Sequence, residues 1–564
     1  MPAKYNISSM IILLFVLLCC ETRINYKAGQ AVGKMSTQEK IGQMLMLGVP
    51  DNKICKETTA IITNYYPGGI ILFGYNIGST EDTRQYIKEM QQTAISNYRI
   101  PMFISIDQEG GRVRRITSGV TQFPGNMAFG VADNESLVYD SARITGMELR
   151  MIGINMNLAP AIDVNNNSLN PVINTRSFGS DSDIVSRLGA AYIKGLQKSK
   201  CIAVCKHFPG HGDTDKDSHL TLPVIHHNIE RLHKVEFPPF VRAIDNNVEG
   251  VMTAHISFPE ILKNNLPATI SKEFLTDILR NKMHFKGIVI TDDMEMNAVS
   301  KIMDLGDAAV KSVIAGTDIV LVSTYGNSIE IISGALNKAV ADGIIPVDRI
   351  NESVERIIKT KLRFGIMNDE EGKSKYEDYN YTKEEAEILT KSEELNRKVS
   401  RESIYFYSGS NYRKEDFINN EFSKIFISSN SFFITEVGSL ADKDLKKSIK
   451  LFKTENDFIN QTLKSALQNK EKKSLKNTIA YYQFDRIDNN SINKIINVCK
   501  ENQIKLYFLC TGNPFPLGSI KGLPPVFFTF SSTHESIKQL VLCLNGGFEP
   551  KKSINVNMGM PDKK

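Results

Sequence analysis

The chain of 564 residues lacks several features by which proteins are often classified. It contains no tryptophan, no C-x-x-C pair and no G-x-S-x-G motif. Without G-x-S-x-G, a serine nucleophile of the α/β-hydrolase type is not expected, and the scattered cysteines decide nothing about the redox compartment. The net charge is only +5, from 68 basic and 63 acidic residues, so the overall charge does not point to nucleic acid.

Long apolar runs are missing too. The run Met10–Leu18 has nine residues, too few to span a bilayer but suited to the apolar region of an export signal. Lys4 precedes it, and Cys19-Cys20 follow at a place that resembles a bacterial lipoprotein processing site. We expect an export leader over residues 1–20, lipidation of Cys20 or Cys19, and a periplasmic or membrane-anchored protein; the alternative is a buried N-terminal strand.

A globular composition is present instead, with 41% hydrophobic and 23% charged residues. The length exceeds that of one ordinary core and predicts two domains. Ser36–Glu39 has the capping-box pattern of a helix start, with Ile41, Met44 and Leu45 at helical spacing behind it. We place the beginning of the first folded domain there.

The first domain alternates short apolar, β-rich segments with helical candidates, which favours a parallel α/β fold and, by its length, a (β/α)8 barrel of the TIM type. The seven strands that can be placed are Gly69–Phe73, Met102–Ile106, Asn155–Ala159, Ile202–Cys205, Val251–Ala254, Ile288–Ile290 and Ile319–Val322. The helices expected between them are Thr83–Asn97, Leu137–Met151, Ser182–Gln197, Ile229–Asn246, Ser271–Asn281 and Asp307–Ala315. The eighth strand cannot be placed from the sequence.

A second, smaller α/β domain with a parallel sheet is expected behind a charged linker. The predicted boundaries are 36–366 for the barrel, 367–382 for the linker and 383–564 for the second domain. Its expected elements are helices Lys383–Ser400, Asp457–Gln468, Ile492–Asn502 and Thr533–Leu544, and strands Ser403–Tyr407, Lys424–Ile427, Thr478–Gln483, Ile504–Cys510 and Val526–Phe530.

Polar groups follow the carboxyl ends of successive predicted strands in the first domain. The residues concerned are Asp107, Asp163, Lys206, His207, His255, Asp292 and Asp293. In a barrel these loops converge on one mouth, so the pattern predicts an active site there.

The densest group is the stretch Lys206–His219, which holds three histidines and three aspartates on a loop broken by Pro209, Gly210 and Gly212. A solvated loop without a role is one alternative. A metal site at His207 and His211 is another, but the proline and glycine between them deny the helix that such spacing requires. In Asp217-Ser218-His219, a carboxylate two residues from an imidazole can instead fix its tautomer and raise its basicity.

Lys206–Gly212 followed by Asp217-Ser218-His219 resembles the signature of glycoside hydrolase family 3, in its β-N-acetylglucosaminidase branch. The likeness runs strongly from Glu39–Met44 to Arg363–Gly365 and weakly through Gly512–Phe515. It implies a barrel followed by an α/β sandwich domain that many members lack. Without tryptophan, tyrosine and phenylalanine must form any platform for stacking on a sugar.

The resemblance implies that Asp292, taken as the first aspartate after the sixth strand, is the nucleophile of a retaining glycosidase. It implies His219, oriented by Asp217, as the acid and base. Read from the residues alone, Asp292 can be a helix N-cap, although Asp293 is the better candidate for that cap.

The matching motifs also imply a set of sugar-binding residues: Asp107, Arg115, Arg176, Lys206 and His207. Read from the residues alone, they can be structural ion-pair partners. Asp163, His211 and His255 are weaker candidates, and His211 can equally brace the loop. No metal and no cofactor is implied.

The expected function is an exo-β-N-acetylglucosaminidase that acts on peptidoglycan fragments or chitooligosaccharides. A GlcNAc-containing glycan is the expected partner, with no nucleic acid, and the oligomeric state stays open. Three alternatives remain: a phosphorylase, because a neutral histidine admits an anionic acceptor; a β-glucosidase; and a silent sugar-binding surface lipoprotein.

Overall fold

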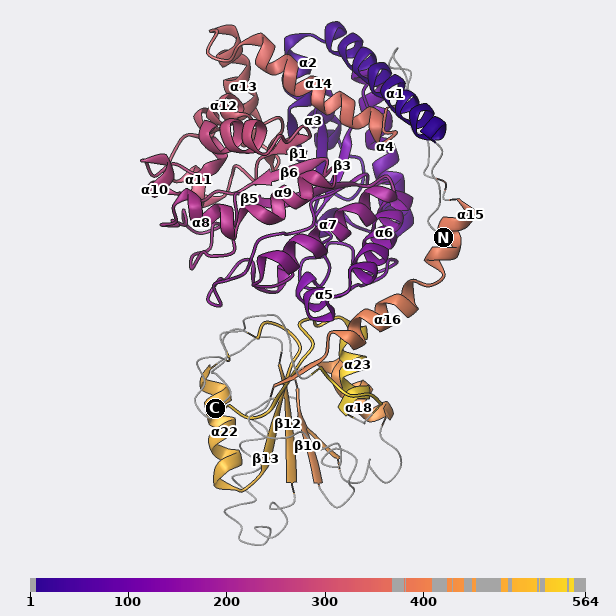
Figure 1. Cartoon of the computed structure of the whole chain (residues 1–564), viewed down its shortest axis with the longest axis vertical. Helices are drawn as coiled ribbons and strands as arrows, with labels where there is room; N and C mark the ends of the chain where they lie inside the picture. The colour runs from indigo at the N-terminus through magenta and orange to yellow at the C-terminus, as the bar shows by residue number, and fades with distance from the viewer. Residues whose placement is uncertain are drawn as a thin grey trace.

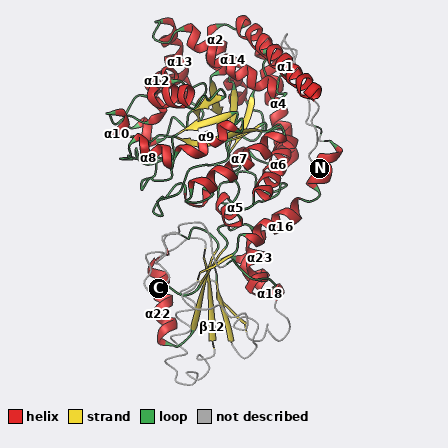
Figure 2. Cartoon of the chain, in the orientation of Figure 1, coloured by secondary structure: helices red, strands yellow, loops and turns green. Residues whose placement is uncertain are grey.

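A computed structural model of the chain describes residues 7–367, 380, 382–407, 423–428, 430–440, 449–452, 478–484, 489–514, 517, 523–544 and 547–551. Figure 1 shows two lobes, a larger one from the first part of the chain and a smaller one from the last part. Helices surround the strands of the larger lobe (Figure 2). The predicted linker 367–382 and the predicted helix Asp457–Gln468 lie almost wholly or wholly outside the described residues.

The larger lobe is a closed barrel of eight parallel strands. The strands are β1 (Leu45–Gly48), β2 (Gly69–Leu72), β3 (Phe103–Ile106), β4 (Met156–Asn157), β5 (Ile202–Phe208), β6 (Gly250–Thr253), β7 (Ile288–Ile290) and β8 (Val320–Val322). Their order in the sheet is β7-β6-β5-β4-β3-β2-β1-β8. A parallel bridge between Ile290 and Ile319 joins the two ends of this order. The (β/α)8 prediction is confirmed.

Strand β1 is the eighth strand, for which the sequence pattern predicts no position. Ser36 does cap a helix, α2 (Thr37–Gln43), with the predicted capping box. Met44 and Leu45, assigned to that helix by their spacing, leave it: Met44 ends the helix and Leu45 begins β1. Because β1 comes first, Asp292 follows the seventh strand and not the sixth.

The helices of the barrel are mostly as predicted. They are α3 (Lys56–Tyr65), α4 (Thr80–Tyr98), α5 (Asn126–Ala132), α6 (Glu135–Ile152), α7 (Ser182–Lys198), α8 (Ile229–Lys234), α9 (Phe237–Asp245), α10 (Pro259–Leu262), α11 (Asn297–Ser300), α12 (Leu305–Ala315), α13 (Asn327–Ala341) and α14 (Val347–Arg363). Short 3-10 turns lie at η1 (Gly74–Asn76), η2 (Asn174–Arg176) and η3 (Ala268–Ile270), and η4 (Glu273–Lys282) is wound as a π-helix. The helix predicted over Ile229–Asn246 is two helices, because Pro238 and Pro239 start a new one.

Helix α1 (Ile7–Lys34) precedes the barrel and packs along α14 (Figure 1). Ala28, Ala31 and Val32 join the barrel's hydrophobic core. Arg363 of α14 pairs with Glu21 at 3.0 Å and with Glu249 at 2.9 Å. Within the part of the chain that the structure describes, no helix has the length and apolar character needed to cross a membrane.

The smaller lobe holds a six-stranded sheet in the order β11-β10-β12-β13-β14-β9. Its strands are β9 (Tyr405–Tyr407), β10 (Ser423–Ile427), β11 (Ile449–Phe452), β12 (Thr478–Phe484), β13 (Lys505–Cys510) and β14 (Val526–Phe528). All pairs are parallel except β14 with β9. This confirms a smaller α/β domain after the barrel.

Helices lie on both faces of that sheet (Figure 1). Helices α18 (Ser431–Leu440) and α23 (His534–Leu544) lie on one side and α22 (Asn489–Glu501) on the other, whereas α15 (Lys383–Leu389) and α16 (Ser392–Glu402) contact barrel helix α6. The single helix predicted over Lys383–Ser400 is interrupted at Thr390 and Lys391, between α15 and α16.

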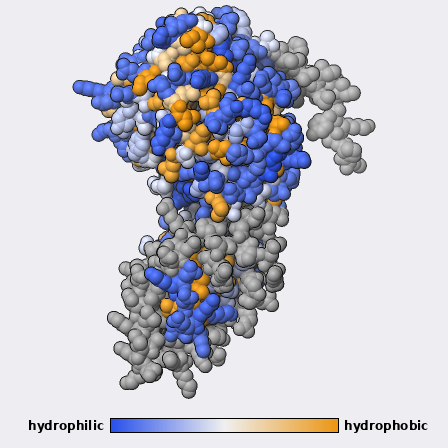
Figure 3. Space-filling view, turned by 90° about the vertical axis from the view of Figure 1, so that its left-hand side faces the viewer, coloured by the Kyte–Doolittle hydropathy of each residue, from blue (hydrophilic) through white to orange (hydrophobic). Residues whose placement is uncertain are grey.

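Helix α5 connects the two lobes. Its residues Met127, Ala128 and Val131 belong to a hydrophobic cluster that is otherwise built from the second domain. Lys551 Nζ donates to the backbone carbonyls of Val131 at 2.7 Å and Ala132 at 3.0 Å. The barrel's own surface is mixed, with polar regions broken by apolar patches (Figure 3).

Candidate active site

All eight residues predicted to bind or transform substrate line one cavity of about 360 Å³ at the carboxyl ends of the barrel strands. They are Asp107, Arg115, Arg176, Lys206, His207, Asp217, His219 and Asp292. A cavity of this size lies within the range of small-molecule sites. The nearby candidate His211 also lines it, whereas Asp163 and His255 stand behind it as supports.

Asp292 lies directly after β7, and its surroundings favour the ionised carboxylate. Its Oδ1 accepts a hydrogen bond from the backbone amide of Asp293 at 2.9 Å. Burial opposes ionisation of Asp292, but His207, His255, that amide and Lys206 outweigh it and hold the pKa below the usual aspartate value. A carboxylate kept ionised in a cavity suits a nucleophile.

Asp293 is not the helix cap that the sequence suggested. Helix α11 begins at Asn297 with Met296 at the cap position. The Asp293 carboxylate instead accepts from the hydroxyl of Ser323 and from the amide of Glu295 at 3.2 Å. It thereby ties the loop after β7 to the loop after β8. Burial raises the pKa of Asp293 to about 6.

The end of β5 supplies Lys206 and His207, which are joined by a cis peptide bond. The Nδ1 of His207 bonds Asp163 Oδ2 at 2.8 Å, and its backbone amide donates to Asp163 Oδ1 at 3.1 Å. Asp163 is fully buried, and the two histidines at 207 and 211 hold its pKa low against that burial. Because Asp163 holds Nδ1, the opposite edge of the His207 ring faces the cavity. There His207 Nε2 lies 3.4 Å from Arg176 Nη2.

A buried ion-pair network forms the floor beside His207. Lys206 Nζ lies 2.7 Å from both Asp107 Oδ1 and Glu109 Oε1. Arg176 donates two hydrogen bonds to Glu109, from Nε to Oε2 at 2.9 Å and from Nη2 to Oε1 at 2.8 Å. Burial opposes ionisation of Glu109, but Arg176 and Lys206 outweigh it and keep the pKa well below the usual value. Arg176 and Lys206 are therefore ion-pair partners, as the alternative interpretation held. Both side chains also line the cavity.

Glu109 is a site residue that the sequence motifs did not mark. Its carboxylate is nearly fully buried, two residues beyond Asp107, and it orients the cavity's cations. A carboxylate between two predicted site residues on a loop after a strand was the available signal. Asn297 was missed as well: its Nδ2 donates to the carbonyl of His219 at 2.9 Å, and nothing in its local sequence marks it.

The loop after β5 carries the Asp217–His219 pair. His219 Nδ1 lies 2.8 Å from Asp217 Oδ1, which also accepts the His219 amide at 2.8 Å. Burial opposes ionisation of Asp217, but the bonds from His219 outweigh it and lower the pKa. The His219 side chain lines the cavity and is 62% exposed, so solvent reaches its ring.

His211 braces this loop from inside. Its Nε2 lies 3.0 Å from Ser218 Oγ and its Nδ1 3.0 Å from Thr214 Oγ1. Burial lowers the pKa of His211 to about 4, so the ring is neutral near neutral pH. His255 is likewise buried with a lowered pKa, and its Nε2 donates to the carbonyl of Asp293 at 3.0 Å.

The aromatic side chain of Phe73 lines the cavity. Phe73 and Tyr75 stack with their ring centroids 5.9 Å apart and their planes 8° apart. The guanidinium of Arg115 lies 5.5 Å above the Phe73 ring and 3.4 Å from Asp107. Tyr75 and Tyr325 are each about half exposed. Aromatic faces at a polar cavity suit the apolar face of a sugar ring.

Comparison with known proteins agrees with this geometry. A family model for the glycosyl hydrolase family 3 N terminal domain matches residues 36–360, more than half of the chain. The match places the chain in the class of glycoside hydrolases. It belongs to glycosyl hydrolase family 3.

Two relatives are beta-hexosaminidases. Beta-hexosaminidase A from Pseudoalteromonas piscicida is 37% identical over 281 residues, which is 47% of each chain, so our chain spans about half of that relative's length. The beta-hexosaminidase of Hydrogenovibrio crunogenus is 34% identical over 261 residues, 45% of this chain and 71% of the relative.

A solved structure covers both lobes. The family 3 beta-N-acetylglucosaminidase from Paenibacillus sp. str. FPU-7 matches with a TM-score of 0.80 and 30% identity, over 93% of this chain and 99% of the other. The barrel followed by an α/β domain is therefore an arrangement that the two chains share.

Proposed function

We propose that the protein is a retaining exo-β-N-acetylglucosaminidase. The observation that carries the proposal is that Asp292 and the Asp217–His219 pair, from two different loops, line the same sugar-sized cavity. The likeness to beta-hexosaminidases and to a beta-N-acetylglucosaminidase supports this substrate class. A cavity of about 360 Å³ suits the removal of one terminal sugar.

In the first step, Asp292 attacks the anomeric carbon as the bond from that carbon to the leaving oxygen breaks. Protonated His219 gives its proton to that oxygen, and a glycosyl–Asp292 ester forms. Asp217 keeps the proton on Nδ1 and aims Nε2 at the leaving group. Because His219 is exposed, it acts when the loop folds over bound substrate.

In the second step, His219 takes a proton from water, whose oxygen forms a bond with the anomeric carbon while Asp292 leaves. Two displacements retain the configuration. Asp107 accepts hydrogen bonds from sugar hydroxyls, and Arg115, Arg176, Lys206 and His207 donate to them. The cations also favour ionised Asp292.

Peptidoglycan fragments and chitooligosaccharides are the proposed substrates. Phosphorolysis stays a second candidate, because a deprotonated His219 presents no negative charge to an incoming phosphate. The β-glucosidase and the silent binder are the remaining alternatives, and the intact Asp292 and Asp217–His219 pair disfavour the silent binder.

The test is turnover of nitrophenyl-GlcNAc beside nitrophenyl-glucose, each with and without phosphate. We expect release from the GlcNAc substrate, no acceleration by phosphate, and loss of turnover in Asp292→Ala with an unchanged circular dichroism spectrum. Release from glucoside alone, or only with phosphate, identifies one of the alternatives. No release from either supports the binder.

Export and lipidation of Cys20 or Cys19 are part of the proposal, supported by the charged and apolar pattern of residues 1–20. Mass spectrometry of the N-terminus of the protein purified from its native membranes should find a lipidated cysteine. An unmodified Met1 or Pro2 would remove this part of the proposal without touching the activity.

A further inference from the structure

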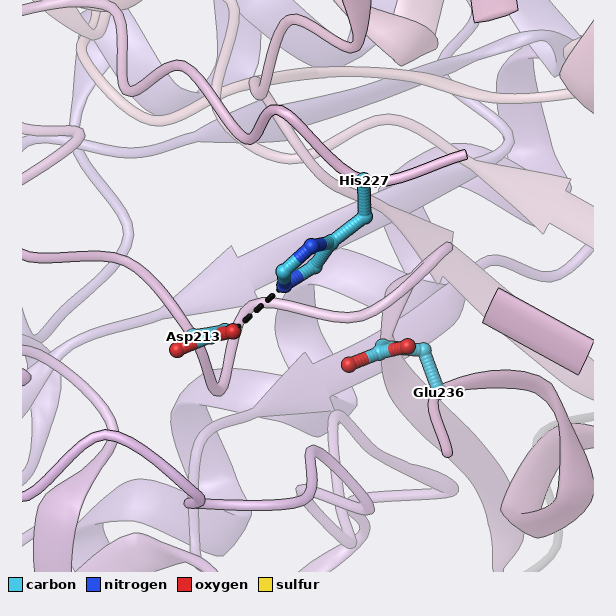
Figure 4. Close-up of side chains that lie close together, drawn as sticks. All are labelled: Asp213, His227 and Glu236. Atoms are coloured by element: carbon cyan, nitrogen blue, oxygen red, sulfur yellow. Dashed lines mark hydrogen bonds and ion pairs between the residues drawn. The ribbon is translucent and has the colours of Figure 1, made fainter. Parts of the chain in front are cut away.

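A second group of charged side chains lies at the base of the His219 loop, outside the cavity. Asp213, His227 and Glu236 each offer one ligand atom, and these atoms lie within 4.8 Å of one another (Figure 4). None of the three lines the active-site cavity. They come from three separate places: the start of the loop, its end, and the junction between α8 and α9.

Glu236 shows that this group is incompletely neutralised. Its side chain is only 3% exposed, and among the described residues its Oε2 has no hydrogen-bond partner. In Figure 4 the carboxylate points toward Asp213 and His227. A buried carboxylate oxygen without a donor is costly and is a vacant acceptor for a cation.

Arg231 pairs with the carboxylates of both Asp213 and Glu236, and both contacts are long. Its Nη2 lies 3.2 Å from Glu236 Oε1 and 3.7 Å from Asp213 Oδ2. The Arg231 side chain is 34% exposed, so it can turn outward into solvent. Its Nε lacks a hydrogen-bond partner among the described residues.

We propose that Asp213, His227 and Glu236 bind a divalent transition-metal ion of the zinc class, which takes the place of the Arg231 guanidinium. One imidazole and two carboxylates, completed by water, form a three-ligand zinc set. His227 Nε2 and Asp213 Oδ2 are 2.5 Å apart. Ligand atoms about 2.0–2.1 Å from a tetrahedral ion lie roughly 3.3 Å apart, so binding needs a shift of less than about 1 Å at this pair.

An ion bound at this site would hold the neighbouring loop at both of its ends. Asp213 and His227 are the two ends of the segment that carries Asp217 and His219. An ion that ligates both ends replaces a single hydrogen bond with two coordination bonds and fixes the base of the loop. The inference does not depend on the proposed glycosidase activity, because its test reads metal binding.

The test is titration of the full-length protein, freed of metal by a chelator, with Zn²⁺ alone in a calorimeter. We expect one tightly bound ion per chain and a rise in the midpoint of thermal unfolding. His227→Ala should weaken binding by at least about tenfold, and Arg231→Met should strengthen it because the competing cation is gone. His226→Ala is the matched control, since His226 is 72% exposed and adjacent, and it should leave binding unchanged.

Three results would overturn the proposal: no Zn²⁺ binding by the unchanged protein, equal binding in His227→Ala, or loss of binding in His219→Ala with retention in His227→Ala. The last result would place the ion in the active-site cavity. Glu236→Gln serves if His227→Ala does not fold. If neither folds, Arg231→Met decides alone, and equal or weaker binding there overturns the proposal.

Discussion

Two adjacent aspartates illustrate how environment assigns different roles to the same side chain. Asp292 has a lowered pKa because basic groups and a backbone amide outweigh its burial. Asp293 has a pKa raised to about 6, since burial and the charge of Glu295 outweigh its hydrogen bonds to Ser323 and Glu295. Neighbouring carboxyl groups with pKa values pushed apart are typical of active sites. Of the two, Asp292 stays ionised to the lower pH.

His219 supplies the first prediction at this scale. His219→Ala should slow substrates with poor leaving groups by about 10²–10⁴-fold, because general acid catalysis contributes that much. Activated dinitrophenyl glycosides, which need no proton, should lose far less in their first step. The measurement is kcat/KM across a series of leaving groups at one pH. Equal losses across the series would contradict the acid role.

The sequence pattern named residues that the structure brings to one cavity, because several of them sit in a motif with fixed spacing and the others follow strand ends. It did not predict Glu109 as their counter-ion, or Asn297 as the tether of the His219 carbonyl. Both act through contacts between loops that are far apart in the chain. Such contacts depend on how the strands are arranged in the barrel, which spacing alone does not encode.

Among the elements, the loop after β5 depends on a close approach at Gly212. A Cβ built there would lie 1.8 Å from the carbonyl oxygen of Val164, so no other residue fits without moving the backbone. This contact seats the loop against the chain that follows β4. The positions of His211 and His219 therefore depend on it.

Gly212→Ala should displace the loop and lower kcat by about 10²-fold, the cost of roughly 1 Å of misplacement in an active site. The barrel should stay folded, which circular dichroism checks. Gly334→Ala on α13 is the matched control, because nothing lies within 4 Å of its added methyl group. Equal activities for the two variants would show that the close approach does not position the loop.

Element prediction from the sequence failed where local signals conflict. Met44 and Leu45 continue a helical spacing, yet strand β1 starts at Leu45 because the open barrel edge between β2 and β8 has to be filled. The predicted helix over Ile229–Asn246 divides ahead of two prolines. Pairing with neighbouring strands set the start of β1, which the local sequence does not show. The prolines that divide the second helix are visible in the sequence.

At the scale of the whole molecule, α5 couples the second domain to the active site. One face of α5 enters the second domain's core through Met127, Ala128 and Val131. Asn126, at its first turn, donates from Nδ2 to the carbonyl of Arg176 at 2.7 Å. The second domain thus supports the segment that presents Arg176 to the cavity.

Val131→Asp should separate the two domains, because it places a charge without a partner in their shared core, where Val131 is 3% exposed. We expect calorimetry to show the second domain unfolding at a lower temperature than the barrel. Val241→Asp on α9, where the side chain is 41% exposed, is the control and should unfold as the unchanged protein does. Identical unfolding of both variants would refute the coupling.

The two-domain plan was readable from the alternation of strands and helices, whereas the contact between the domains was not. Helix α5, which makes that contact, is seven residues long and buried throughout, so it shows no amphipathic pattern that would mark a docking face.

The central claim is that Asp292 becomes covalently bound to the sugar. The most direct measurement is mass spectrometry of His219→Ala incubated with dinitrophenyl-GlcNAc. Its first step needs no acid, and its second lacks the base, so the intermediate should accumulate. The account predicts a single N-acetylhexosaminyl adduct on the peptide that contains Asp292. An adduct on another residue, or dinitrophenol release with no adduct and inverted product, would contradict it.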